Sequence, residues 1–137
     1  MARQITLDDR EVIEIVNSQG AVTGSFLFNP TDLDIVQRCE KVIDYFNNLQ
    51  MPDSENVDMD AFNSISNQIK DQFDYLLDSE ASVTLFAHCN PLSPREDGTL
   101  YCEYVLDTIT KFIEKEYNVR TKKTQARISK YTRKYQK

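Results

Sequence analysis

Apolar residues recur every three or four positions along three long segments of this 137-residue chain, and this spacing constrains the fold more than any other feature. The segments cover residues 31–49, 58–77 and 99–117. Such spacing places the apolar side chains on one face of a helix, which then packs against a core. The first segment shows the pattern most completely, with Ile35, Val36, Cys39, Val42, Ile43, Phe46 and Leu49. The sequence therefore predicts three amphipathic helices.

Residues 11–28 predict a β-hairpin that precedes these helices. A short β-branched run is followed by the turn sequence NSQG, in which Gly20 suits a left-handed backbone conformation. Alternation along the return strand places three apolar side chains on one face: Val22, Phe26 and Phe28. Gly24 falls on the same face, where a bulge or a close backbone contact is expected. Ile5 and Leu7 either prolong the first strand or form a short strand of their own.

The remaining segments complete an α+β fold in which helix dominates. Residues 82–87 fit a helix, a short strand or a buried connector, and residues 90–98 form an irregular loop with two prolines. Asn118 is expected to end the third helix or to begin a break, and a fourth helix is predicted at about 122–135. The architecture is thus an N-terminal β-hairpin followed by three or four packed α-helices.

Charge is distributed very unevenly along the chain. Residues 120–137 contain eight Lys or Arg residues and no Asp or Glu, out of 16 basic and 22 acidic residues in all. Residues 1–119 therefore carry a formal charge of −14, against +8 for the rest. We interpret 1–119 as an acidic globular body and 120–137 as a basic C-terminal helix or tail of the same domain. This division favours a binding or assembly protein over an enzyme.

Three interpretations of the basic tail remain open. It is a terminal helix that docks on the acidic body through Tyr131 and Tyr135, or a site for an acidic protein partner or a second copy of the chain. Alternatively, it binds nucleic acid, because Lys and Arg interleaved with Tyr suit phosphates and stacked bases. The acidic body opposes this last interpretation, since it repels a polyanion at close range.

The sequence carries no recognisable catalytic or cofactor-binding signature. His88 is the only histidine, and no glycine-rich phosphate loop is present. Cys39, Cys89 and Cys102 lack the close pair that is typical of zinc sites and the spacing of a disulfide framework. We therefore predict a protein that is not an enzyme, with no metal or cofactor. No apolar run approaches the length of a membrane span or a signal peptide, so a cytoplasmic location is expected.

Three short motifs carry a resemblance to a known group of proteins. Residues 26–32 (FLFNPTD) end the hairpin and enter a helix that contains Arg38, and residues 83–86 (VTLF) precede the proline-containing loop. The chain finishes with the basic, tyrosine-rich residues 131–135 (YTRKY). Over residues 11–135, this order resembles the small tail assembly chaperones and related tail-region proteins of long-tailed phages and prophages of Gram-positive bacteria.

The resemblance implies a role in assembly. Such proteins bind the long, helical tape measure protein in the host cytoplasm, keep it soluble while the tail tube polymerises, and self-associate. Two surfaces are predicted to bind the partner: the hairpin end (Phe26, Phe28) and the basic tail (Arg127, Tyr131, Arg133). A nucleic-acid-binding regulator that acts through the tail, and a structural component of the virion tail, are the alternatives.

Overall fold

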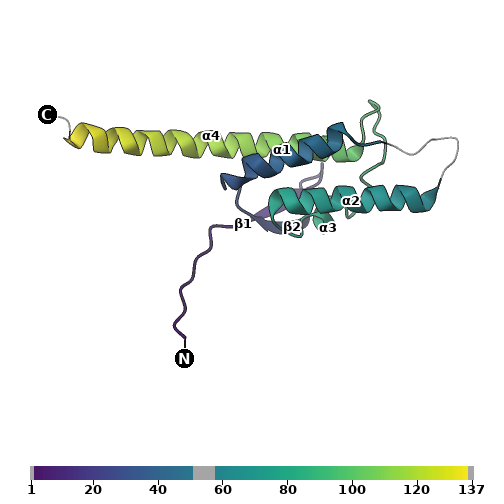
Figure 1. The fold of residues 1–137 in the computed structure, drawn as a ribbon, viewed down its shortest axis with the longest axis horizontal. Helices are drawn as coiled ribbons and strands as arrows, with labels where there is room; N and C mark the ends of the chain where they lie inside the picture. The colour runs from purple at the N-terminus through teal and green to yellow at the C-terminus, as the bar shows by residue number, and fades with distance from the viewer. Residues whose placement is uncertain (1, 51–57, 136–137) are drawn as a thin grey trace.

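The computed structural model describes residues 2–50 and 58–135, and in the last helix it describes side chains as far as Arg127. Within these residues the chain forms a two-stranded antiparallel hairpin followed by four helices, which confirms the predicted α+β fold (Figure 1). The elements are β1 (Glu11–Val16), β2 (Val22–Phe28), α1 (Asp34–Asn47), α2 (Met59–Leu77), α3 (Ser82–Leu85) and α4 (Tyr101–Tyr135).

The hairpin has the predicted turn, but a bulge changes one of its faces. Gly20 adopts a φ of 82°, as the turn sequence predicted. Ile15 pairs with Gly24 and Val16 pairs with Val22, so β2 contains one extra residue, Thr23. Because a bulge reverses the alternation beyond it, Val22 is 55 % exposed, whereas Phe28 is 2 % exposed. The prediction that Val22 shares the buried face was therefore wrong.

The first residues of the chain form an extended arm outside the hairpin. Residues 2–10 belong to no strand, and Ile5 and Leu7 are almost fully exposed (Figure 1). β1 begins at Glu11, opposite Phe28, the last residue of β2. Pro30 follows and has no N–H to donate, so the partner strand ends there. Ile5 and Leu7 thus neither prolong β1 nor form a strand of their own.

The three predicted amphipathic helices supply most of the core. α1 and the first half of α4 run alongside each other, with α2 below them and the hairpin near one end of α2 (Figure 1). The core combines buried residues of the helices with Phe28 of β2, and Ile13 and Ile15 of β1 pack against it. Its fully buried side chains of greatest volume are Phe28, Phe73, Ile69, Leu76, Leu77, Val42, Pro30, Pro91 and Cys102.

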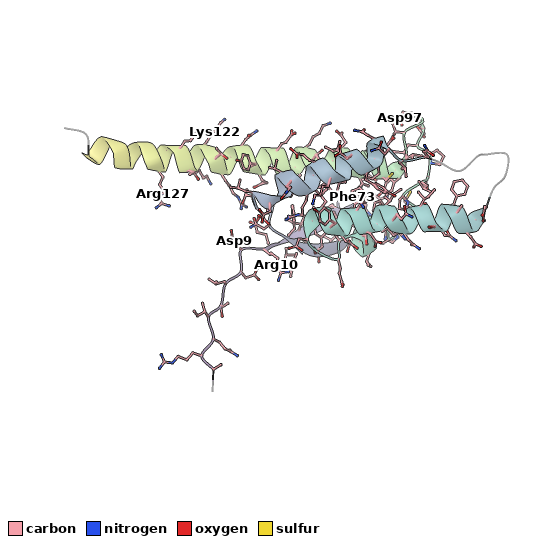
Figure 2. The ribbon with its side chains drawn as sticks, viewed as in Figure 1. Asp9, Arg10, Phe73, Asp97, Lys122 and Arg127 are labelled. Carbon is pink, nitrogen blue, oxygen red and sulfur yellow. The ribbon has the colours of Figure 1, made fainter. Side chains whose placement is uncertain are left out.

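Aromatic rings connect the helices through the centre of this core. Phe73 of α2 lies 6.1 Å from Phe46 of α1 and 5.1 Å from Phe86, measured between ring centroids, and both contacts are edge-on. Phe86 continues the series to Tyr101 at the start of α4, 6.0 Å away. Edge-to-face rings attract one another beyond the effect of burial alone. Phe73, labelled in Figure 2, therefore lies between the rings of Phe46 and Phe86.

The segment after α2, which the sequence left open, is the short helix α3. α2 ends at Leu77, and the next residue, Asp78, caps it in a left-handed conformation with a φ of 49°. The chain then turns back, and the carboxylate of Asp74 accepts hydrogen bonds from the backbone N–H of Ser82 at 2.7 Å and from its hydroxyl at 2.9 Å. A carboxylate at this point satisfies a donor that would otherwise have no partner at the start of a helix.

α3 also holds the hairpin, through a close approach at Gly24. A Cβ atom on Gly24 would lie 2.6 Å from Cγ2 of Thr84, so only glycine fits without a shift. The hydroxyl of Thr84 donates a hydrogen bond to the carbonyl of Ser25 at 3.1 Å. The close backbone contact that the sequence predicted at Gly24 is thus confirmed, and its partner is the side chain of Thr84.

We expect Gly24→Ala to lower the free energy of unfolding by about 1–3 kcal/mol, because the added methyl group overpacks against Thr84. Thr84→Ser removes Cγ2 and keeps the hydroxyl, so the double variant Gly24→Ala/Thr84→Ser should recover most of the loss. Urea denaturation followed by circular dichroism measures both values. A double variant no more stable than Gly24→Ala alone would contradict the steric explanation.

The last helix is continuous, which corrects the predicted break at Asn118. α4 runs for 35 residues from Tyr101 to Tyr135, about 50 Å at the usual rise per residue. Asparagine costs a helix only a few tenths of a kcal/mol, and no Gly or Pro lies nearby to end it. The guanidinium of Arg120 donates to the Thr31 hydroxyl at 2.9 Å and to the Glu11 carboxylate at 2.8 Å. Beyond Arg120, α4 projects away from the body (Figure 1).

Candidate functional site: an apolar groove between α1 and α4

An apolar groove runs between α1 and the first half of α4. It consists of two adjoining hollows of about 240 Å³ and 410 Å³, which share Ile43 and Thr110. The first hollow is almost entirely apolar; its lining residues are Ile35, Val36, Cys39, Glu40, Ile43, Thr110, Ile113 and Glu114. The second continues toward the N-terminus of α4, past Phe46 and Leu106.

The groove exists because the apolar surface of α1 is wider than the core covers. Ile35 and Val42 are buried in the core. Val36 and Ile43 are 55 % and 43 % exposed, and they lie seven residues apart, on one side of the helix. Two apolar side chains so placed form a second stripe, which faces the groove. The arrangement is typical of a helix that receives another helix.

Two carboxylates mark the groove on opposite sides. Glu40 comes from α1 and Glu114 from α4, and both line the first hollow. Within the described residues neither takes part in an ion pair. Burial raises the pKa of the Cys39 thiol, and the negative charges of Glu114 and Glu40 raise it further. The groove is therefore apolar at its floor and negative at its rim.

The two cysteines in the groove behave as apolar side chains. Cys102 of α4 lies under the second hollow, fully buried, and burial raises its pKa to about 11. Cys39 is half-buried and its pKa is also raised, so both thiols are protonated at neutral pH. Among the described residues, no three His, Cys, Asp or Glu side chains come together as metal ligands would. The chemistry of the groove is that of a binding surface.

The residues predicted to bind a partner are not brought together. Phe28 is a core residue, and the ring of Phe26, partly buried, lies 6.3 Å from it. Phe28 thus presents no surface to a partner in this structure, because α-helices cover that face of the hairpin. Arg127 is exposed on the projecting half of α4 (Figure 2). The side chains of Tyr131 and Arg133 lie outside the described residues, and the binding role of the basic tail stays a prediction.

The location of this groove between α1 and α4 and the residues that line it were not predicted from the sequence, although the sequence contained one signal. The apolar residues of the first helix are adjacent in pairs, Ile35 with Val36 and Val42 with Ile43, and a pair spans more than one narrow face. Such doubling indicates a helix that packs on two sides. The contribution of Thr110 and Glu114 had no signal, because neither residue is apolar.

In the part of the chain that the structure describes, no helix is both long enough and apolar enough to cross a membrane. Comparisons with protein-family models, with curated proteins and with solved structures found no match to this chain. The groove and the uneven charge distribution are therefore the features of the molecule that bear on its function.

Proposed function

We propose that this protein is a non-catalytic helix-binding protein that acts in the cytoplasm as an assembly chaperone for a long helical partner. The single observation that carries the proposal is the apolar, acid-rimmed groove between α1 and α4. The resemblance noted in the sequence supplies the specific form of the proposal, a phage tail assembly chaperone whose partner is a tape measure protein.

The dimensions and chemistry of the groove suit an amphipathic helix. α1 has 14 residues, so it offers a wall of about 21 Å, or roughly four helical turns. A helix laid in such a groove anchors apolar side chains spaced three, four and seven residues apart. Glu40 and Glu114 favour a ligand with Lys or Arg beside those anchors. The strong negative charge of residues 1–119 would keep the complex soluble.

A charged substitution in the groove tests the proposal. We expect Val36→Glu to weaken binding of the helical partner at least tenfold, because it places a carboxylate on the apolar wall beside Glu40. Val83→Glu is the matched control, since Val83 is 75 % exposed on α3, outside the groove. The measurement is the soluble fraction of a tape measure protein co-expressed with each variant.

Three outcomes of that experiment are informative. Higher solubility of the partner with the unmodified chain and Val83→Glu, and not with Val36→Glu, supports binding in the groove. Equal solubility with and without the unmodified chain would refute the chaperone proposal. Equal protection by all three chains would place the binding surface elsewhere on the molecule.

One observation favours a second candidate, a nucleic-acid-binding regulator. The basic half of α4 extends away from the acidic body, with Lys122 on it (Figure 2). Both Lys122 and Lys123 are exposed. This separation weakens the repulsion that the body exerts on a polyanion. The candidate predicts an affinity for nucleic acid that falls steeply with salt and disappears when the chain ends at Val119. Recovery of the protein in purified particles would instead support a structural tail component.

A further inference from the structure

We propose that a second copy of this chain occupies the α1–α4 groove when no partner is bound, through the C-terminal half of its α4. This inference rests on the proposed function, because it assumes that the groove binds a helix. It goes further in two ways: the occupant is a segment of the protein itself, and the helical partner must displace that segment in order to bind.

The projecting half of α4 has the length that the groove requires. Residues 120–135 amount to about 24 Å of helix, against about 21 Å for the wall that α1 provides. The side chains of residues 122–127 are exposed. A helical segment whose described side chains, 122–127, are exposed has little stability of its own, so packing against another surface would stabilise it.

The charges of the two surfaces are complementary. Residues 120–137 contain eight basic and no acidic residues. The groove is flanked by Glu40 and Glu114, and its second hollow adds Glu103 and Asp107. Opposite charges across an interface favour encounter and set orientation more than they add affinity. The apolar wall of the groove supplies the affinity.

The basic segment also carries apolar residues at helical spacing. Tyr117 lies partly exposed where α4 leaves the body, and Ile128, Tyr131 and Tyr135 follow at intervals of 11, three and four residues. In a helix, this sequence spacing is the one that places all four residues on one face. Apolar positions at three and four residues are the anchors that a helix-binding groove receives.

The geometry requires the segment to come from a second copy. α4 forms one wall of the groove with residues 102–114, and it continues in one direction to Tyr135 (Figure 1). Residues 120–135 therefore lead away from the groove of their own chain. Two copies related by a two-fold axis would each place this segment in the groove of the other, which closes the assembly as a dimer. The helical partner must then displace it.

Disulfide trapping tests the contact directly. In a Cys89→Ser background, Ile128→Cys should form a disulfide with Cys39 of the other copy under mild copper–phenanthroline oxidation, which gives a dimer on a non-reducing gel. Lys122→Cys is the matched control, because position 122 lies on the opposite face of α4 and should not be trapped. Loss of the trapped dimer on Cys39→Ser identifies the native thiol involved. Equal trapping of the two introduced cysteines would overturn the proposal.

Charge reversal tests the same contact at equilibrium. We expect Glu40→Lys/Glu114→Lys to raise the dimer dissociation constant at least tenfold by sedimentation equilibrium, because like charges brought together across an interface cost more than opposite charges gain. Arg127→Glu/Lys134→Glu in the same chain should restore the dimer, since positions 127 and 134 flank the apolar positions in helical spacing. Asp71→Lys/Glu80→Lys, on and near the outer side of α2, is the control of equal charge. A full-length chain that stays monomeric, or a dimer insensitive to the reversal, would overturn the inference.

Different results would refute the self-docking inference and the proposed chaperone function. If the full chain is monomeric while Val36→Glu still reduces protection of the helical partner, the self-docking inference is wrong and the proposed function stands. If the trapped dimer forms while the partner gains no solubility, the groove binds only a second copy and the chaperone proposal is wrong.

Discussion

Replacing Phe73 by alanine is expected to lower the free energy of unfolding by about 3–5 kcal/mol, the largest stability effect of any substitution considered for this chain. Phe73 has no exposed surface and contacts both Phe46 and Phe86 edge-on. Truncation removes a buried ring and leaves a cavity, and it interrupts the aromatic series that joins α1, α2 and α4. A loss of this size approaches the whole stability of many small domains.

Urea denaturation followed by circular dichroism measures this loss, and Phe112→Ala is the matched control. Phe112 lies on α4 with 37 % of its side chain exposed, so the same truncation there should cost clearly less. If Phe73→Ala cost no more than Phe112→Ala, the core would not be centred on the aromatic series. If Phe73→Ala fails to fold, Phe73→Leu keeps most of the volume and should give a smaller, measurable loss.

The main elements of the fold could be predicted because each has a strong local pattern. The spacing of Ile69, Phe73 and Leu76 requires a helix with one buried face, and these residues are indeed fully buried. Gly20 reports the hairpin turn through its need for a positive φ, and that conformation is present. Local conformational preference and burial agree at these positions, so the sequence alone was sufficient.

The predictions that failed depend on tertiary context. The bulge at Thr23, which exposes Val22, lies next to Gly24, whose close neighbour Thr84 on α3 is 60 positions away in the chain. α4 continues past Asn118 because nothing local ends it, and contacts of Arg120 with Thr31 and Glu11, residues more than 80 positions away in the chain, fix it just beyond that point. Contacts of such sequence separation leave no periodic signal.

The candidate site was even less visible than the fold. A groove between two helices depends on the distance between the helices and on the residues that line it. The periodicity of one helix gives neither the distance nor the lining residues. The hairpin phenylalanines, which the sequence favoured as a binding surface, pack against the core instead, Phe28 completely. Exposed apolar residues such as Val36 and Ile43 became informative only once the packing of α1 was known.

The second large effect is expected from Asp74→Ala, which should lower the free energy of unfolding by about 2–3 kcal/mol, as is typical when a charged acceptor is removed from buried donors. The carboxylate of Asp74 accepts both the N–H and the hydroxyl of Ser82, a residue that is itself buried. Without it, two donors at the start of α3 lose their partner. α3 should then loosen from the end of α2.

Amide hydrogen exchange distinguishes a loosened α3 from a general loss of stability. α3 holds the hairpin through the hydrogen bond from Thr84 to the Ser25 carbonyl, so Asp74→Ala should speed amide hydrogen exchange in β1 and β2 more than in α1. Asp74→Asn keeps one oxygen acceptor and should show a smaller loss and nearly normal exchange. Uniformly faster exchange in all elements would mean that α3 does not secure the hairpin. The close fit of Gly24 to Thr84 would then be a result of the way β2 packs, and not the contact that fixes β2 in place.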